Sequence, residues 1–117
     1  MSVDEAARRA RFAPILRAEL AALQAQSAKT GADRRPVEPD QQSVGRLSRM
    51  DAIQGQQMAA AIEARRGQRI VAIRAALARI DADEFGWCED CGDDIGEARL
   101  AVDATVRRCV ACAQARG

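Results

Sequence analysis

The sequence predicts a mainly α-helical protein in which an antiparallel helical hairpin is attached to a small module that contains four cysteines. Two segments rich in helix-forming residues carry apolar side chains at helical spacing. A loop containing Gly31, Pro36 and Pro39 separates these segments. The cysteines lie in the last third of the chain as two pairs. The 117 residues suffice for one domain of ordinary size and are too few for two.

The composition favours an elongated helical shape over a large globular core. Hydrophobic residues make up 48% of the chain, but 26 of these are alanines. Aromatic residues make up only 3%, which excludes an aromatic β-sandwich and a base-stacking platform for single strands. The absence of histidine excludes histidine-based acid–base catalysis and mixed Cys/His metal sites.

The overall charge does not favour nucleic acid or an anionic membrane as a partner. Eighteen basic and 17 acidic residues give a formal net charge of +1. No apolar run approaches the ~20 residues of a membrane span, and the polar N-terminus lacks the apolar stretch of a secretory signal. We therefore expect a soluble, cytoplasmic protein.

The first helix is expected from Asp4 to about Ala28. Its apolar residues recur at spacings of four, four and three, namely Phe12, Leu16, Leu20 and Leu23. Pro14 lacks a backbone donor and its ring clashes with the preceding turn. The sequence therefore predicts a kink or a break near Ala13.

A second, longer helix is expected from about Val44 to Ala82, after a polar loop over residues 29–43. Its apolar residues are Leu47, Met58, Ile62, Ile70, Ile73, Leu77 and Ile80, and the last four follow a heptad-like spacing. Neither helix can bury its apolar face alone. We expect the two helices to pack as an antiparallel coiled-coil hairpin with the 29–43 loop at its tip.

The four cysteines have the spacing of a metal site. Cys88, Cys91, Cys109 and Cys112 form a C-x2-C, x17, C-x2-C arrangement. Two-residue gaps let both sulfurs of a pair reach one ion, and the longer gap brings the pairs together. The pattern predicts one structural Zn²⁺, because four thiolates leave no coordination position for a reacting water. A thioredoxin-type function is disfavoured by the lack of a βαβ pattern, while thiol oxidation as a secondary sensing property stays open.

An acidic block surrounds the first cysteine pair. It contains eight carboxylates and no basic residue: Asp81, Asp83, Glu84, Glu89, Asp90, Asp93, Asp94 and Glu97. One interpretation is a solvated face offset by the arginines of the other half of the module, Arg99, Arg107, Arg108 and Arg116. The other interpretation is an acidic patch that faces a protein partner.

The C-terminal third resembles a known family. The residues that carry the resemblance are the helix end and first cysteine pair ALARIDADEFGWCEDCG, the later IG and RL pairs, and the second cysteine pair CVAC. They are similar to those of the DksA/TraR family of zinc-finger transcription regulators over residues 70–112. Residues 44–60 resemble a subgroup of short family members.

This resemblance implies a coiled-coil hairpin, residues 1–84, and a zinc-finger module with a short C-terminal helix, residues 85–117. It implies a nonenzymatic protein that binds bacterial RNA polymerase rather than DNA and modulates transcription initiation. The hairpin tip would enter the secondary channel of the polymerase. We expect a monomer, with no sequence-specific DNA binding and no membrane contact.

The tip differs from that of better-known family members. Ungapped alignment back from Cys88 places the family motif D-x-x-D-x-A on Gly45, Ser48 and Met50, so the acids of the motif are missing. The carboxylates near the tip are Glu38, Asp40 and Asp51, and these are the candidate tip residues.

A response to guanosine tetraphosphate stays open. Ala72, Asp103 and Ala113 stand where responsive members of the family have basic groups, whereas Arg65 is retained.

Two further interpretations belong to other functional classes. The chain could be a zinc-stabilised coiled-coil adaptor for a different protein partner, without activity toward the polymerase. Direct nucleic-acid binding through Arg107, Arg108 and Arg116 is the third interpretation, and it would show as a salt-dependent shift with DNA alone.

Overall fold

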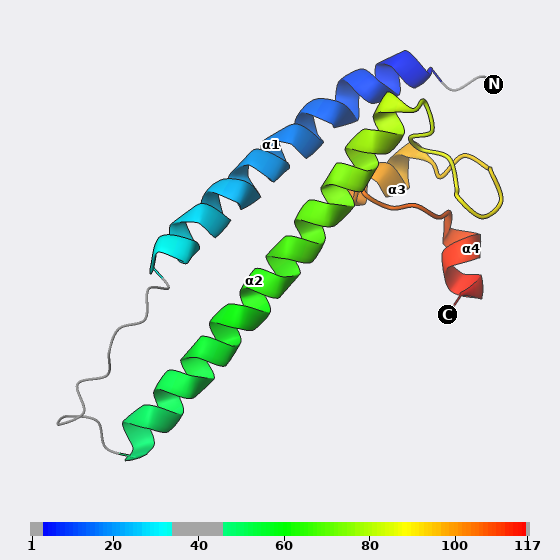
Figure 1. The fold of residues 1–117 in the computed structure, drawn as a ribbon. Coiled ribbons are helices and arrows are strands. Elements are labelled where there is room, and N and C mark those ends of the chain that lie inside the picture. Colours follow the sequence, from blue (N-terminus) through cyan, green and yellow to red (C-terminus); the bar gives the residue numbers. More distant parts are fainter. Residues whose placement is uncertain (1–3, 34–45, 117) are drawn as a thin grey trace.

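Two long helices determine the shape of the molecule. The computed structural model describes residues 4–33 and 46–116, with extents of 71 × 30 × 20 Å. Helices α1 (Glu5–Asp33) and α2 (Arg46–Asp81) run along its length, and the short helices α3 (Glu97–Val102) and α4 (Val110–Ala115) lie at one end (Figure 1). The described ranges contain no β-strand. The predicted mainly α fold class is confirmed.

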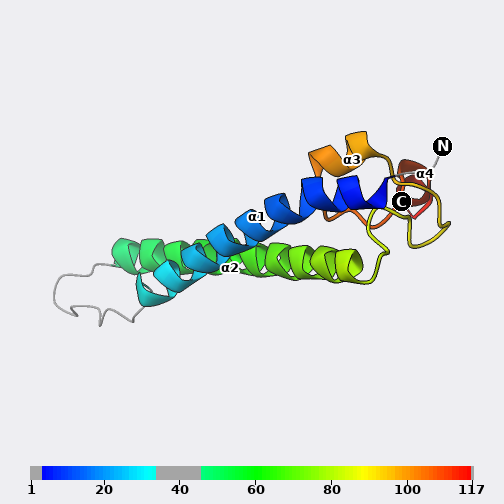
Figure 2. The ribbon, with the colours of Figure 1, turned by 90° about the horizontal axis from the view of Figure 1, so that it is seen from above.

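Helices α1 and α2 form an antiparallel hairpin, seen from two directions in Figures 1 and 2. Arg69 of α2 donates two hydrogen bonds of 2.8 and 2.9 Å to the carboxylate of Glu19 in α1. Closer to the tip, Arg66 donates to the hydroxyl of Thr30 at 3.1 Å. Residue numbers therefore rise along α1 as they fall along α2.

The hydrophobic core lies where the hairpin meets the C-terminal module. Phe12 and Leu16 of α1 are 1% exposed, and Ile73 of α2 is fully buried. The module contributes Phe85, Ile95, Leu100 and Ala104 to the same cluster. Leu20, Leu23 and Leu77 pack against it while partly exposed, as the predicted apolar faces require. The base of the hairpin and the module therefore share one core.

The first half of α2 does not take part in that core. Every side chain described from residue 49 to residue 62 is exposed, including Met58 at 68% and Ile62 at 49%. The prediction that Met58 and Ile62 continue the buried stripe is therefore wrong. The side chain of Leu47 lies outside the described residues.

None of the helices in the described ranges is long and apolar enough to span a membrane.

Helix α1 differs from its prediction at two places. It continues through Pro14 without a break, since the burial of Phe12 and Leu16 on either side holds the helix together across the missing bond. It also extends to Asp33, so residues 29–33 are helical rather than part of a loop. The contact of Thr30 with Arg66 supports these last turns. The rest of the predicted loop lies outside the described residues.

Candidate metal centre

The first cysteine pair lies on a tight turn between α2 and α3. The amide of Cys88 donates to the carbonyl of Asp93 at 2.8 Å, and the amide of Gly92 donates to the carbonyl of Cys88 at 2.9 Å. Gly92 has a φ of 76°, in the left-handed region that a residue without a Cβ adopts readily. An isolated antiparallel bridge between Trp87 and Asp94 closes the turn. This backbone directs Cys88 and Cys91 to the same side.

The second pair lies at the start of α4. Cys109 is the residue just before the helix, and Cys112 is three positions later, within its first turn. The amide of Ala113 donates to the carbonyl of Cys109 at 2.9 Å, which fixes this turn. Residues three apart on a helix share a face, so both sulfurs point toward the first pair.

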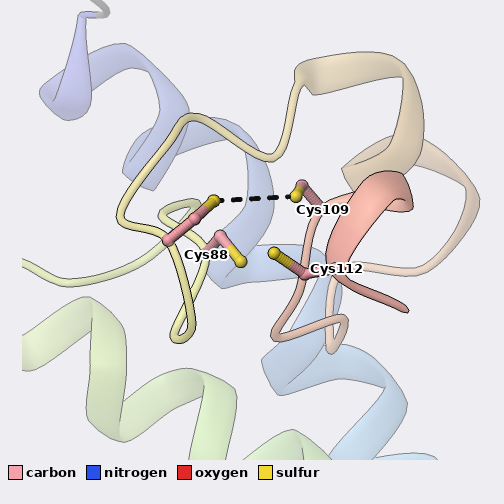
Figure 3. Close-up of side chains that lie close together, drawn as sticks. Cys88, Cys109 and Cys112 are labelled. Carbon is pink, nitrogen blue, oxygen red and sulfur yellow. Dashed lines mark hydrogen bonds between the residues drawn. The ribbon is translucent and has the colours of Figure 1, made fainter. Parts of the chain in front are cut away.

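The four sulfurs meet in one cluster. All four Sγ atoms lie within 4.8 Å of one another, and those of Cys91 and Cys109 are 3.7 Å apart. In Figure 3 the sulfurs of Cys88, Cys109 and Cys112 point into a common space. A tetrahedral zinc with Zn–S bonds of about 2.3 Å requires sulfurs about 3.8 Å apart. The cluster therefore fits one zinc ion.

The thiols of the cluster differ in how readily they lose their protons. Backbone hydrogen bonds at Cys109 and Cys91 lower the pKa of Cys88 to about 6, so this sulfur is largely a thiolate at neutral pH. Hydrogen bonding with the Cys109 sulfur, and then with those of Cys88 and Cys91, raises the pKa of Cys112. The remaining thiols must lose their protons to hold zinc, so zinc affinity falls as the pH falls.

Part of the acidic block is neutralised within the module. The carboxylate of Asp90 accepts hydrogen bonds from Arg108 at 2.9 Å and from Arg116 at 2.9 and 3.1 Å. Glu89 lies 3.8 Å from Arg107 and 3.9 Å from Arg108. Hydrogen bonds from Arg116 lower the pKa of Asp90 more than burial raises it. These pairs join the turn of the first cysteine pair to the segment of the second.

Comparison with known proteins identifies the module. Residues 83–116 match the family model of the prokaryotic dksA/traR C4-type zinc finger. Residues 83–116 form a zinc finger of the DksA/TraR type. The predicted family resemblance and the predicted four-cysteine zinc site are thereby confirmed, since the sulfurs of this zinc finger are arranged to hold one ion.

Two individual relatives support this assignment. The RNA polymerase-binding transcription factor DksA of Haemophilus influenzae is 42% identical over 40 residues, which span 34% of this chain and 28% of that protein. Transcription factor DksA2 from Pseudomonas aeruginosa has a similar structure, with a TM-score of 0.75 over 94% of this chain and 83% of that one. At 22% identity, the second match shows that the similarity of fold extends over the hairpin.

The predicted tip residues are not brought to this zinc finger. Asp51 is exposed in the first half of α2, on the part of the hairpin away from the module. Glu38 and Asp40 lie outside the described residues.

Sequence reasoning missed the residues of α1 that hold the DksA/TraR-type module. Trp87 donates its indole N–H to Glu5 at 3.2 Å, and Arg11 donates to Glu97 at 2.7 Å. Arg8 is 2% exposed. A signal for Arg8 exists, because it precedes Phe12 by four residues and so lies on the apolar face of α1.

Proposed function

We propose that this protein is a nonenzymatic regulator that binds bacterial RNA polymerase and modulates transcription initiation in the cytoplasm. The observation that carries the proposal is the joining of a DksA/TraR-type zinc finger to a long hairpin whose fold is similar to that of DksA2. The curated relative that matches the zinc finger is itself named as an RNA polymerase-binding transcription factor. The proposed route of binding is the secondary channel of the polymerase.

The shape of the hairpin is consistent with entry into a channel. The shared core lies at the base, and residues 49–62 of α2 project beyond it with every side chain exposed. Met50, Ile53, Met58 and Ile62 are each about half exposed or more. A bare helical segment with exposed apolar side chains can contact channel walls along its length. The zinc module would stay outside and set the depth of insertion.

We propose that carboxylates near the tip act on the polymerase active centre. The candidates are Glu38, Asp40 and Asp51, and Asp51 is exposed as this role requires. A charge in a confined, partly dehydrated space acts more strongly than in bulk water, so a carboxylate there can disturb metal or substrate contacts.

Direct DNA binding is not part of the proposal. Two of the three arginines that could contact phosphates, Arg108 and Arg116, hydrogen-bond to Asp90. Arg107 has Glu89 within 3.8 Å. A gel-shift assay with DNA alone should therefore show no salt-dependent complex.

We also propose that the protein is a monomer, and sedimentation of the purified protein tests this.

The test is multi-round transcription with purified polymerase, with and without the protein. The Glu38→Ala/Asp40→Ala variant should keep its zinc and its polymerase binding but lose most of its effect on transcript yield. The matched control is Asp81→Ala/Glu84→Ala, which removes the exposed acid at the C-terminal end of α2 and another three residues after it, and this variant should retain the wild-type effect. Unchanged activity in the tip variant would contradict the role of the loop acids. Repeating the assay with guanosine tetraphosphate tests whether it modifies the response.

The adaptor interpretation is retained as a second candidate because the exposed apolar side chains of α2 could equally contact another protein. The absence of the family's acidic tip motif also favours it. The two candidates differ in two outcomes. An adaptor would leave transcription unchanged at every promoter, and it would not compete with DksA for polymerase.

A further inference from the structure

A buried arginine joins α1 to the zinc-binding turn. The side chain of Arg8 is 2% exposed although it carries a charge, and charged side chains are almost never buried without a partner. Its Nη1 lies 2.9 Å from Asp94 Oδ1 and donates to the carbonyl of Gly86 at 3.4 Å. Glu97 lies 4.0 Å from its Nε. One guanidinium from α1 therefore contacts three points of the module.

The partners of Arg8 flank the first cysteine pair. Gly86 precedes Cys88 by two residues, and Asp94 follows Cys91 by three. The carbonyl of Gly86 also accepts a 2.9 Å hydrogen bond from the amide of Ile95. This bond joins the two ends of the turn next to the position of the Arg8 guanidinium. Arg8 thus contacts both ends of the turn that carries two of the four zinc ligands.

The pocket around Arg8 has no room for a larger residue at Gly86, and it requires the nearby counter-ion Asp94. A Cβ added to Gly86 would lie 2.3 Å from Arg8 Nη1, so only a glycine leaves room for the guanidinium. The Nε of Arg8 is buried and has no hydrogen-bond partner among the described residues. Displacing Asp94 would leave a buried charge without its nearest counter-ion, which is strongly unfavourable. The buried position of Arg8 is therefore stable only while the turn keeps its present shape.

The other contacts between α1 and the turn that carries Cys88 and Cys91 come from residues of α1 close to Arg8. Phe12 packs against Phe85 with ring centroids 5.8 Å apart, and Glu5 accepts the Trp87 indole hydrogen bond. The second half of α1 contacts α2 through Glu19 and Thr30, and the partner of Glu19, Arg69, also donates to Asp103 of the module at 2.9 Å. The contacts of α1 with the turn that carries Cys88 and Cys91 therefore come from its first half, which packs on α2 through the shared core as well.

We propose that Arg8 is a positioning residue that couples zinc binding to the attachment of the first turns of α1. With zinc held, the turn presents Asp94 and the Gly86 carbonyl to Arg8. Without zinc, the turn loses this shape and releases residues 5–13 of α1 from the module, while the second half of the hairpin stays paired. Linkage makes the effect reciprocal, so loss of the Arg8 contact weakens zinc binding.

Zinc affinity tests the reciprocal effect. Arg8→Met keeps the unbranched stem and removes the charge, and we expect an affinity about tenfold lower than wild type in competition with a chromophoric chelator. The matched control is Arg17→Met, because Arg17 is exposed on the same helix and makes no ion pair among the described residues. Equal affinities for the Arg8 and Arg17 variants would overturn the proposal.

Asp94→Asn provides a second route if Arg8→Met fails to fold. The asparagine keeps an acceptor for the amide of Gly96, which now bonds Asp94 Oδ1 at 3.0 Å, and removes only the charge that faces Arg8. Its zinc affinity should also fall about tenfold, and the double variant should fall no further than either single variant. Additive losses, or an unchanged Asp94→Asn, would contradict the coupling.

Hydrogen exchange tests the structural effect. Chelation of zinc from the wild-type protein should speed exchange at the amides of residues 9–13 at least tenfold more than at those of residues 21–27 in the same helix. In Arg8→Met the amides of residues 9–13 should exchange fast even with zinc bound. Equal changes in both halves of α1, or none in either, would overturn the proposal.

Discussion

Individual side chains in the shared core determine how much stability the hairpin has. Ile73 is fully buried between α1 and the module, whereas Ile62, three turns earlier on the same helix, is 49% exposed. Ile73→Ala should lower the free energy of unfolding by about 2–5 kcal/mol, because it leaves a cavity. Ile62→Ala should change it by less than about 1 kcal/mol. Chemical denaturation of both variants checks this, and similar losses would contradict the observed burial pattern.

Asp103 gives the protein a defined pH dependence. Burial raises the pKa of Asp103, but hydrogen bonds from Thr105 and Arg69 outweigh burial and lower it below the ordinary value. The stabilisation is therefore present above the ordinary pKa of about 3.9 and is lost as the pH falls through the folded-state value. Asp103→Asn should be less stable than wild type at about pH 7, and the difference should shrink below about pH 4. A difference that is constant across this range would contradict the assignment.

For individual side chains, the sequence predicted the apolar contacts better than the polar ones. Phe12, Leu16, Ile73 and Ile80 were found because helical spacing alone places them on one face. The contact of Arg8 with Asp94 spans 86 positions of the chain and depends on the path of the turn between them, which no local pattern encodes. The cysteine cluster was predictable because metal coordination limits the spacing of its ligands.

The long helices are not uniformly stable along their length. Gly67 lies inside α2, and a Cβ added there would meet nothing within 4 Å. Gly67→Ala should raise the free energy of unfolding by about 0.5–1 kcal/mol, because alanine loses less backbone entropy on folding. Gly86→Ala is the contrasting variant and should destabilise, since Gly86 has a φ of 89° and no room beside Arg8. Thermal unfolding of both variants checks this. Melting temperatures that shift in the same direction for both would contradict it.

The elements that the sequence predicted best are those with a long, repeated signal. Helix α2 begins and ends within two residues of its expected limits. The short C-terminal helix α4 was expected from the family resemblance and not from a periodicity of its own. Helix α3 was not predicted, because its six residues are too few to show a periodicity. The extension of α1 through Gly31 to Asp33 was missed for another reason. Contact with Arg66 of α2 outweighs the local preference for a loop there.

At the level of the whole molecule, we expect the fold of the module to depend on zinc, because the module has few large apolar side chains of its own. Freshly purified, reduced protein should contain one zinc per chain. Chelation or Cys109→Ser should abolish the fold of residues 85–117, as judged by loss of dispersed amide signals from the module. Folded, reduced protein with less than half an equivalent of zinc would contradict this account.

Zinc module and hairpin share one core, so the molecule can present the hairpin as a rigid projection to a partner. The most direct test of the proposed partner is the binding of the fluorescently labelled, zinc-loaded protein to purified bacterial RNA polymerase, measured by anisotropy. We expect saturable binding that an unlabelled DksA protein displaces and that Cys109→Ser abolishes. Absence of binding at polymerase concentrations of about 10 μM, where even weak specific complexes form, would contradict it.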